Sequence, residues 1–433
     1  MRPGARTQAA IELLDAIAAE PDIGGRPADR VVAEWFRRRR YAGSKDRKAV
    51  SGQVYAVLRR RAELEWLLDQ AGLDATPRCL VLGLTLREGL DAAELFDGSQ
   101  YSPTPLSTEE SAFCQAPPDA AAMPDWARVS FPAWLEPDLK AQFGDDLAAE
   151  MAALNQRAPL DMRVNTLKGD RQTALEALAA EDIVAVTGRW SPLSLRIENR
   201  ERITHSRAFR EGLVEVQDEG VQLIALLVAA QPRQQVVDFG AGAGGKTLAL
   251  AAAMENTGQV YALDSDPRRL GRMKERLERA GTRNVQSRVV APEAPPPEDL
   301  GEIADRVLLD APCTGTGTWR RNPDLKWRLT PQGLAAEVER QRQRRLLGQA
   351  AALVKPGGRL IYATCSLLAA ENREQSDWFG NTRTDFRPLG VAEVWQDVIG
   401  DPCPTSDSTL MLTPRRHGTD GVFVAIFERL TTM

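Results

Sequence analysis

Two cysteines follow segments that have the pattern of buried strands. Cys313 comes directly after RVLLDAP, and Cys365 lies at the end of RLIYATC. Ligands of open α/β sheets bind at the carboxyl ends of the strands. Because adjacent strands are about 5 Å apart, we expect the two thiols to face one pocket. Cysteine is often a small buried apolar residue, and we keep that interpretation for Cys79, Cys114 and Cys403.

Paired thiols at such positions suit the methylation of a pyrimidine carbon. Carbon 5 of cytosine is too weak a nucleophile to attack a sulfonium unaided. A thiolate that adds to carbon 6 makes the ring an enamine, which takes the methyl group, and a base then removes the carbon 5 proton. A carboxylate near ring nitrogen 3 assists by holding a proton as the ring becomes electron-rich. A free thiol has a pKa of about 8.5, and Lys246 and the arginines after Cys313 are candidates for favouring the thiolate.

A glycine-rich loop lies between a predicted strand and a predicted helix in VVDFGAGAGGKT. Glycine lets the backbone approach a ligand at the helix N-terminus, where free N–H groups favour anions. Asp264 ends the next strand about 20 residues on, the place of a carboxylate that accepts the ribose hydroxyls of an adenosine. The predicted cofactor-binding residues of the loop are Gly240, Ala241, Gly242, Ala243, Gly244, Gly245 and Lys246.

The same loop also satisfies the phosphate-loop pattern of nucleotide triphosphatases over residues 240–247. Three features favour a methyltransferase: the position of Asp264, the Pro-Gly-Gly turn predicted at 356–358, and the thiol that follows Asp310 so closely. The triphosphatase stays open as an alternative, and so does a non-catalytic RNA-binding assembly factor with this fold.

The chain length of 433 residues predicts two or three domains. Apolar residues at helical spacing predict helices in 11–20, 28–38, 50–72 and 80–90, and strand alternation appears at 160–168 and 193–199. From Gln235 strands and helices alternate, which predicts a doubly wound, mostly parallel sheet. Its five strands are expected at 234–240, 259–266, 285–290, 304–312 and 359–366, with a closing hairpin at 408–414 and 421–428. The predicted domains are 1–125, 126–230 and 231–433.

Composition excludes several classes of protein. Hydrophobic residues make up 43% and charged residues 27%, as in soluble globular proteins. No apolar run approaches the roughly 20 residues of a membrane span, so a cytoplasmic protein with no membrane partner is expected. Five cysteines without a CxxC pair and only two histidines argue against a disulfide framework and against a metal site.

Basic residues are concentrated in two blocks although the net charge is −5. Residues 35–61 hold ten Lys or Arg against one acid, and residues 319–345 hold eight against three. Such blocks favour an RNA partner. Trp319 and the arginines after it offer a ring for stacking and cations for phosphate, or else form a surface loop packed by one tryptophan.

The segments DAPCTGTG and YATCSLLAAEN resemble the fourth and sixth motifs of the RNA cytosine-5 methyltransferases of the RsmB and Nop/Sun type. FREGLVEVQDEGVQLIALLV resembles the lead-in to their catalytic domain, HGTDGVFVAIF their closing strand, and the helical N-terminus the NusB-like RNA-binding domain.

The resemblance implies an α/β fold of the class I S-adenosylmethionine methyltransferase type, with a Rossmann-like doubly wound sheet. An all-α NusB-like N-terminal domain and a small α+β subdomain would accompany it. By the same resemblance Cys365 is the nucleophile, Cys313 assists product release, Asp310 contacts the base and Asp264 the ribose of S-adenosyl-L-methionine. The implied partner is RNA, with small-subunit ribosomal RNA favoured.

The chain departs from the family pattern at two places. Gly-Ala-Gly-Ala-Gly-Gly-Lys replaces the Cys-Ala-Ala-Pro-Gly-Gly-Lys that is frequent in the glycine loop. After the third strand, where the family usually offers an Asp to the adenine, the chain has Ala291 and Pro292, with Glu293 as the candidate substitute. The sequence does not identify the cytidine, the oligomeric state (a monomer is favoured) or any accessory protein.

Overall fold

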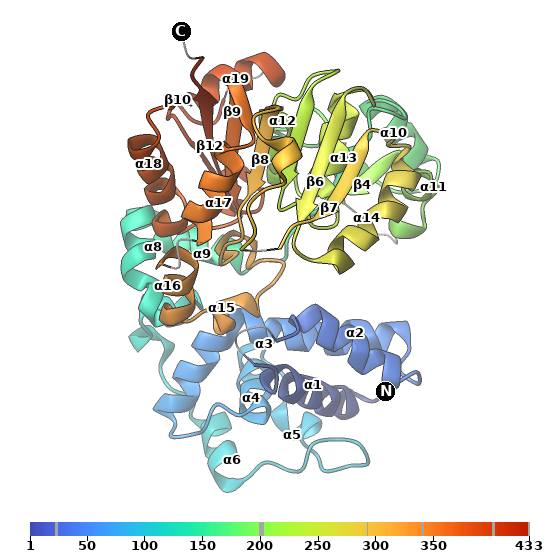
Figure 1. Cartoon of the computed structure of the whole chain (residues 1–433). Coiled ribbons are helices and arrows are strands. Elements are labelled where there is room, and N and C mark those ends of the chain that lie inside the picture. The colour runs from blue at the N-terminus through green and yellow to red at the C-terminus, as the bar shows by residue number, and fades with distance from the viewer. Residues whose placement is uncertain (22–24, 199–202, 292, 340–341, 401–402, 432–433) are drawn as a thin grey trace. The chain divides into compact units, whose positions relative to one another are not determined.

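The computed structural model describes residues 1–21, 25–198, 203–291, 293–339, 342–400 and 403–431 (Figure 1). The chain forms two compact units. One combines Met1–Arg157 with Thr318–Leu334, and the other combines Ala158–Gly317 with Ala335–Met433. The division into three domains at 1–125, 126–230 and 231–433 remains a prediction.

The first unit is helical (Figure 1). The four predicted helices are confirmed as α1 (Pro3–Ala18), α2 (Ala28–Arg38), α3 (Ser44–Gln70) and α4 (Pro77–Arg87). Their apolar faces form one continuous core. Shorter helices follow: α5 (Ala92–Leu95), α6 (Thr108–Gln115), α7 (Asp125–Arg128), α8 (Glu136–Phe143) and α9 (Leu147–Leu154). Helix α6 begins with a capping box between Ser107 and Glu110.

The segment Thr318–Leu334 packs into this helical unit, with helix α15 at Leu325–Arg328. The Trp327 indole N–H donates to the carbonyl of Leu58 over 2.6 Å, and Lys326 is 1% exposed with Nζ 3.0 Å from the Ser130 carbonyl. Trp319 is also 1% exposed. Of the two interpretations kept open for this segment, the structure favours the packed tryptophan over the stacking surface, because the Trp319 side chain is buried.

The second unit begins with a small antiparallel sheet of order β2-β3-β1-β4. The expected strands are β1 (Leu160–Val164) and β3 (Ser194–Ile197), and the unexpected ones are β2 (Ala185–Thr187) and β4 (Val214–Val216). Helices α10 (Arg171–Ala179) and α11 (Arg207–Arg210) accompany it. Apolar residues of these strands and helices form their own core.

The main sheet has the order β10-β12-β9-β8-β5-β6-β7, with β11 paired to β12. The strands are β5 (Gln235–Phe239), β6 (Gln259–Asp264), β7 (Val285–Val289), β8 (Ala304–Asp310), β9 (Val354–Thr364), β10 (Phe386–Leu389), β11 (Leu410–Leu412) and β12 (Val422–Arg429). Strands β5 to β9 are parallel and β12 is antiparallel to β9. The chain order reverses beside β5, which creates a ligand-binding crevice at the strand ends between β5 and β8.

Helices cover both faces of this sheet, which explains why its strands are apolar on both sides. One face packs against α12 (Glu219–Leu227), α13 (Gly245–Ala253) and α19 (Val391–Val398), with α14 (Pro267–Ala280) over β6. The other packs against α17 (Arg342–Ala351) and α18 (Arg373–Thr382). The remaining helices are α16 (Pro331–Glu339) and α20 (Pro414–His417).

Two details differ from the sequence-based expectation. The Pro-Gly-Gly segment lies within β9 and not in a turn before it. The register with β8 shifts there, because Ala304 pairs with Val354 but Arg306 pairs with Arg359, as expected of a bulge. The closing hairpin is confirmed as the antiparallel pair β11 and β12, with α20 between its strands.

Candidate active site

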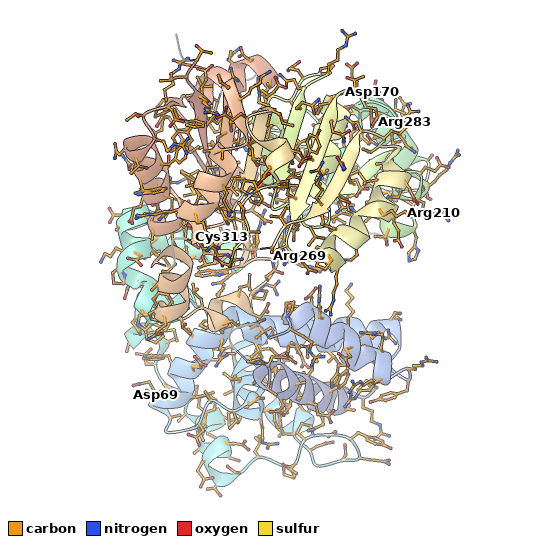
Figure 2. All side chains as sticks on the ribbon, viewed as in Figure 1. Asp69, Asp170, Arg210, Arg269, Arg283 and Cys313 are labelled. Carbon is orange, nitrogen blue, oxygen red and sulfur yellow. The ribbon has the colours of Figure 1, made fainter. Side chains whose placement is uncertain are left out.

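The two predicted cysteines lie side by side at the carboxyl ends of adjacent strands. Asp310 ends β8 and pairs with Ala363 of β9, and the Cys313 and Cys365 sulfurs are 3.4 Å apart. The amide of Gly317 donates to the Cys365 carbonyl over 2.9 Å, which fastens the end of the Cys313 loop to the backbone of Cys365. Figure 2 labels Cys313 at this edge of the main sheet.

A cavity of 420 Å³ opens at these strand ends. Both thiols are partly exposed and line it, as expected from the adjacency of their strands. Arg269, labelled in Figure 2 at the beginning of α14, also lines it. Of the residues predicted from the sequence, the cavity walls include Gly240, Asp264, Asp310, Cys313 and Cys365.

The glycine loop brings its backbone against the β8 strand end. Gly240 has φ of +91°, and a Cβ there would lie 2.5 Å from the Asp310 carbonyl oxygen, so only glycine fits. Gly244, with φ of +84°, precedes the first turn of α13. The loop residues that follow Gly240 in the sequence do not line the cavity: Ala241, Gly242, Ala243, Gly244 and Gly245.

The Asp264 carboxylate is held in place by backbone amides. Gly242 N donates to Oδ2 and Asp266 N donates to Oδ1, each over 2.8 Å. Asp264 is 7% exposed and forms part of the cavity wall. The acid is therefore fixed in orientation at the position predicted for a ribose contact.

Lys246 forms an ion pair with Asp310, with Nζ 2.7 Å from Oδ2. Burial acts to lower the pKa of Lys246, but the charge of Asp310 and its hydrogen bond raise that pKa above the usual lysine value. The neighbouring Thr247 hydroxyl donates to Asp238 over 2.6 Å and is fully buried. A phosphate loop needs this lysine for phosphate and this hydroxyl for magnesium. Both groups are engaged within the protein, which disfavours the triphosphatase alternative.

Glu371, which the sequence-based reasoning missed, organises the Cys313 loop. Its fully buried carboxylate accepts from the Thr314 amide over 2.9 Å and from the Thr314 hydroxyl over 2.5 Å. The hydrogen bond to Cys365, together with burial and the charges of Cys365 and Glu371, raises the pKa of Cys313 well above its usual value. The available signal was the acid within the quoted motif YATCSLLAAEN.

The proposed adenine contact is not assembled from the expected residues. Ala291 lines the cavity, Glu293 does not, and Pro292 lies outside the described residues. The Glu293 side chain is 77% exposed and forms an ion pair with Arg345. An alanine at 291 presents no side-chain acceptor to a ligand.

Within the described ranges, no group of three or more His, Cys, Asp or Glu side chains is arranged to hold a metal ion. Among the helices in the described part of the chain, none combines the length and apolarity required to cross a bilayer.

Comparisons with known proteins agree with this architecture. Residues 225–428 match the family described as 16S rRNA methyltransferase RsmB/F, and residues 131–204 match the ferredoxin-like domain of RsmF/B-like methyltransferases. The probable ribosomal RNA small subunit methyltransferase B of Synechocystis is 31% identical over 415 residues, which cover 89% of this chain and 91% of that protein.

Solved structures share the fold. The crystal structure of PH0851 matches with a TM-score of 0.77 and 26% identity over 99% of both chains. A methyltransferase homologue from Pyrococcus horikoshii has a TM-score of 0.60 and 26% identity, over 72% of this chain and all of its own. The sequence relationships and the shared architecture lead to one conclusion: the chain belongs to the RsmB/F family of 16S ribosomal RNA methyltransferases.

Proposed function

We propose that the protein forms 5-methylcytidine in RNA, with S-adenosyl-L-methionine as methyl donor and Cys365 as nucleophile. The observation that carries the proposal is the pair of thiols 3.4 Å apart in a cavity that Asp310 also lines. A methyltransferase that acts on a nucleophilic nitrogen or oxygen needs no thiol at this place, whereas attack at carbon 5 needs prior activation through carbon 6.

The cavity has features that suit the methyl donor. Gly240 lets the backbone approach a ligand, and the fixed Asp264 carboxylate can accept two ribose hydroxyls. When bound, S-adenosyl-L-methionine supplies an electrophilic methyl group. Ala291 leaves the adenine without the usual carboxylate contact, so ribose recognition by Asp264 carries a larger share of the affinity.

The thiols have different roles in this proposal. The Cys365 thiolate adds to carbon 6, forming a carbon–sulfur bond and leaving carbon 5 as the nucleophilic end of an enamine. The high pKa of Cys313 keeps its proton in place, so this thiol donates a hydrogen bond to the Cys365 sulfur. After methylation, the carbon 5 proton is lost to solvent. The carbon–sulfur bond then breaks, and its electron pair returns to the Cys365 sulfur, where the Cys313 hydrogen bond stabilises the thiolate.

Asp310 and Lys246 would act on the other side of the base. The Asp310 side chain is 30% exposed and faces the cavity while Lys246 holds it. As the ring gains electron density, ring nitrogen 3 takes up a proton from solvent, and the negatively charged Asp310 carboxylate holds that proton there by accepting a hydrogen bond from it. The raised pKa of Lys246 keeps the ammonium charged and the pair intact at neutral pH.

Small-subunit ribosomal RNA is the proposed substrate, since relatives are named as methyltransferases of that RNA. The target cytidine must be unpaired or flipped out, because carbon 6 cannot be attacked within a stack.

The test is mass spectrometry of nucleosides and of protein after incubation with unmodified small-subunit ribosomal RNA and the methyl donor. Wild type should form 5-methylcytidine, Cys365→Ala should form none, and Cys313→Ala should accumulate a protein–RNA adduct. Cys403→Ala is the matched control and should behave as wild type, because Cys403 does not line the cavity. Formation of 5-methylcytidine by Cys365→Ala would overturn the assignment of the nucleophile.

A further inference from the structure

The helical unit carries two strongly exposed aromatic rings beside one cavity. Tyr41 is 72% exposed and Tyr101 is 75% exposed. Both line a cavity of 630 Å³ formed by the beginning of α1 and the segments that contain the two tyrosines. Leaving two large rings in water forfeits the burial free energy that such side chains usually contribute, so their exposure points to a ligand.

Each tyrosine occupies the third position of a hydrogen-bonded turn. The Ala42 amide donates to the Arg39 carbonyl over 3.1 Å, which closes the turn that contains Tyr41. The Ser102 amide donates to the Ser99 carbonyl over 2.9 Å, which closes the turn that contains Tyr101. The two rings are therefore presented by short, closed turns, which lowers the entropy lost when a ligand stacks on them.

The Tyr101 backbone is also strained. Its φ of +70° lies in the left-handed region, which a bulky side chain seldom adopts. The turn is fixed against α1, because a Cβ on Gly4 would lie 2.3 Å from the Ser102 hydroxyl. Strain of this kind is concentrated at binding sites, where the surrounding packing maintains it.

The cavity has one basic side chain in its lining, and further cations lie close to Tyr41 in the sequence. Arg2 lines it, while the acid Glu12, which also lines it, is paired with Arg39 over 3.2 Å. Four exposed cations close to Tyr41 in the sequence have no acidic partner within the described residues: Arg37, Arg40, Lys45 and Lys48. The basic block at 35–61 is divided, because Arg60 and Arg61 at its other end are paired with Glu63 and Glu65.

We propose that this cavity, bordered by Tyr41 and Tyr101, binds unpaired nucleotides of the RNA substrate. The bases would stack on the two rings, and the cations would hold the flanking phosphates. Duplex RNA is a poor fit, because its bases are already stacked. The inference rests on the proposed function, from which the RNA substrate is taken, and it assigns a second RNA contact outside the methyl-transfer site.

The test measures binding of a fluorescent, unstructured RNA octamer to the full chain by anisotropy. Tyr41→Ala and Tyr101→Gly should each weaken binding at least about fivefold, while Tyr41→Phe and Tyr101→Phe should bind within about twofold of wild type. Glycine fits the φ of Tyr101, so that variant should not melt earlier than wild type. Leu90→Ala removes another exposed apolar side chain of this unit and serves as the control.

Unchanged binding by Tyr41→Ala and Tyr101→Gly would overturn the inference, and so would equally tight binding of a duplex octamer. The proposed function can fail separately. If the tyrosine variants weaken binding but wild type forms no 5-methylcytidine, only the proposed function is lost. If wild type forms 5-methylcytidine and the tyrosine variants bind RNA as wild type does, only this inference is lost.

Discussion

The sulfur atoms of Cys313 and Cys365 lie 3.4 Å apart although 52 residues separate them in the chain. The contact arises because β8 and β9 are adjacent parallel strands that end at the same edge of the sheet. Two partly exposed thiols at this separation are both accessible to an oxidant and close enough to be linked by one.

Mild oxidation should therefore inactivate the enzyme reversibly. Diamide accepts two electrons and two protons from the thiols, which close to the roughly 2.05 Å of a disulfide bond. We expect a disulfide-linked peptide pair containing Cys313 and Cys365 in mass spectrometry, with methyl transfer restored by dithiothreitol. Cys403→Ala should show the same loss and recovery. Separate alkylation of both thiols after diamide treatment would contradict the prediction.

Removing the charge of Lys246 should slow methyl transfer more than it weakens substrate binding. Lys246→Met leaves the Asp310 carboxylate without the ammonium 2.7 Å away, so the carboxylate is no longer held toward the base. We expect a fall in the single-turnover rate of about 10²-fold, with RNA affinity within about threefold of wild type. Lys246→Arg retains a cation and should recover part of the rate. An equal loss in both variants would argue for a packing role.

Two glycines of the same loop should tolerate alanine differently. At Gly240 the new Cβ would lie 2.5 Å from the Asp310 carbonyl, whereas at Gly242, with φ of +56°, nothing lies within 4 Å. Gly242→Ala should cost about 1–2 kcal/mol of unfolding free energy through its backbone conformation alone. Gly240→Ala should cost about 1–3 kcal/mol more and should abolish binding of the methyl donor in calorimetry. Equal effects at the two positions would contradict the close approach of the loop to β8.

The alternation of strands and helices was sufficient to predict the main sheet, because its central strands are buried on both faces and are continuously apolar. The missed strands are short or lie at an edge. β10 has four residues, including Pro388, and β2 and β4 have three each, too few for a periodic pattern to emerge. Whether Pro-Gly-Gly forms a turn or a bulge depends on pairing with β8, which is tertiary information.

Within the site, strand ends predicted the positions of Cys313, Cys365 and Asp264, because topology brings strand ends together. Glu371 was missed although it lies within the quoted motif, because its hydrogen bonds with Thr314 join residues 57 positions apart in the chain. The sequence could not decide between the two interpretations of Trp319 for the same kind of reason. After Gly317 the chain passes from the α/β unit into the helical unit, to which Thr318–Leu334 belongs. No local sequence pattern predicts this change of unit.

Glu371→Gln should prolong the protein–RNA adduct. The carboxylate accepts one hydrogen bond at each oxygen from Thr314, whereas an amide has a single acceptor oxygen, so the Thr314 amide and hydroxyl can no longer donate to separate oxygens. We expect the Cys313 loop to lose its fixed position, with slower release of Cys365 from methylated RNA. Denaturing electrophoresis with labelled RNA would measure adduct lifetime. Thr314→Val removes only the hydroxyl and should have a smaller effect in the same direction. An adduct lifetime equal to that of wild type would show that Glu371 does not support release.

Asp238 should make the protein less stable as the pH rises. Burial raises the pKa of Asp238 from 3.8 to about 6, against the opposing hydrogen bond from Thr247. Below pH 4 the carboxyl is protonated in both folded and unfolded chains, and no cost arises. Between pH 4 and 6 the unfolded chain loses this proton while the folded one keeps it, so the free energy of unfolding falls. The loss is complete above pH 6 and amounts to about 3 kcal/mol.

Asp238→Asn should remove this dependence, because an amide does not ionise and its oxygen still accepts from Thr247. The difference in unfolding free energy between the variant and wild type isolates Asp238, since the other titrating groups are common to both proteins. We expect this difference, measured by urea denaturation from pH 4 to 8, to move in favour of the variant as the pH rises to 6 and then to stay level. A difference that does not change with pH would show that Asp238 titrates alike in the folded and unfolded chains, and the buried carboxyl would then carry no pH-dependent cost.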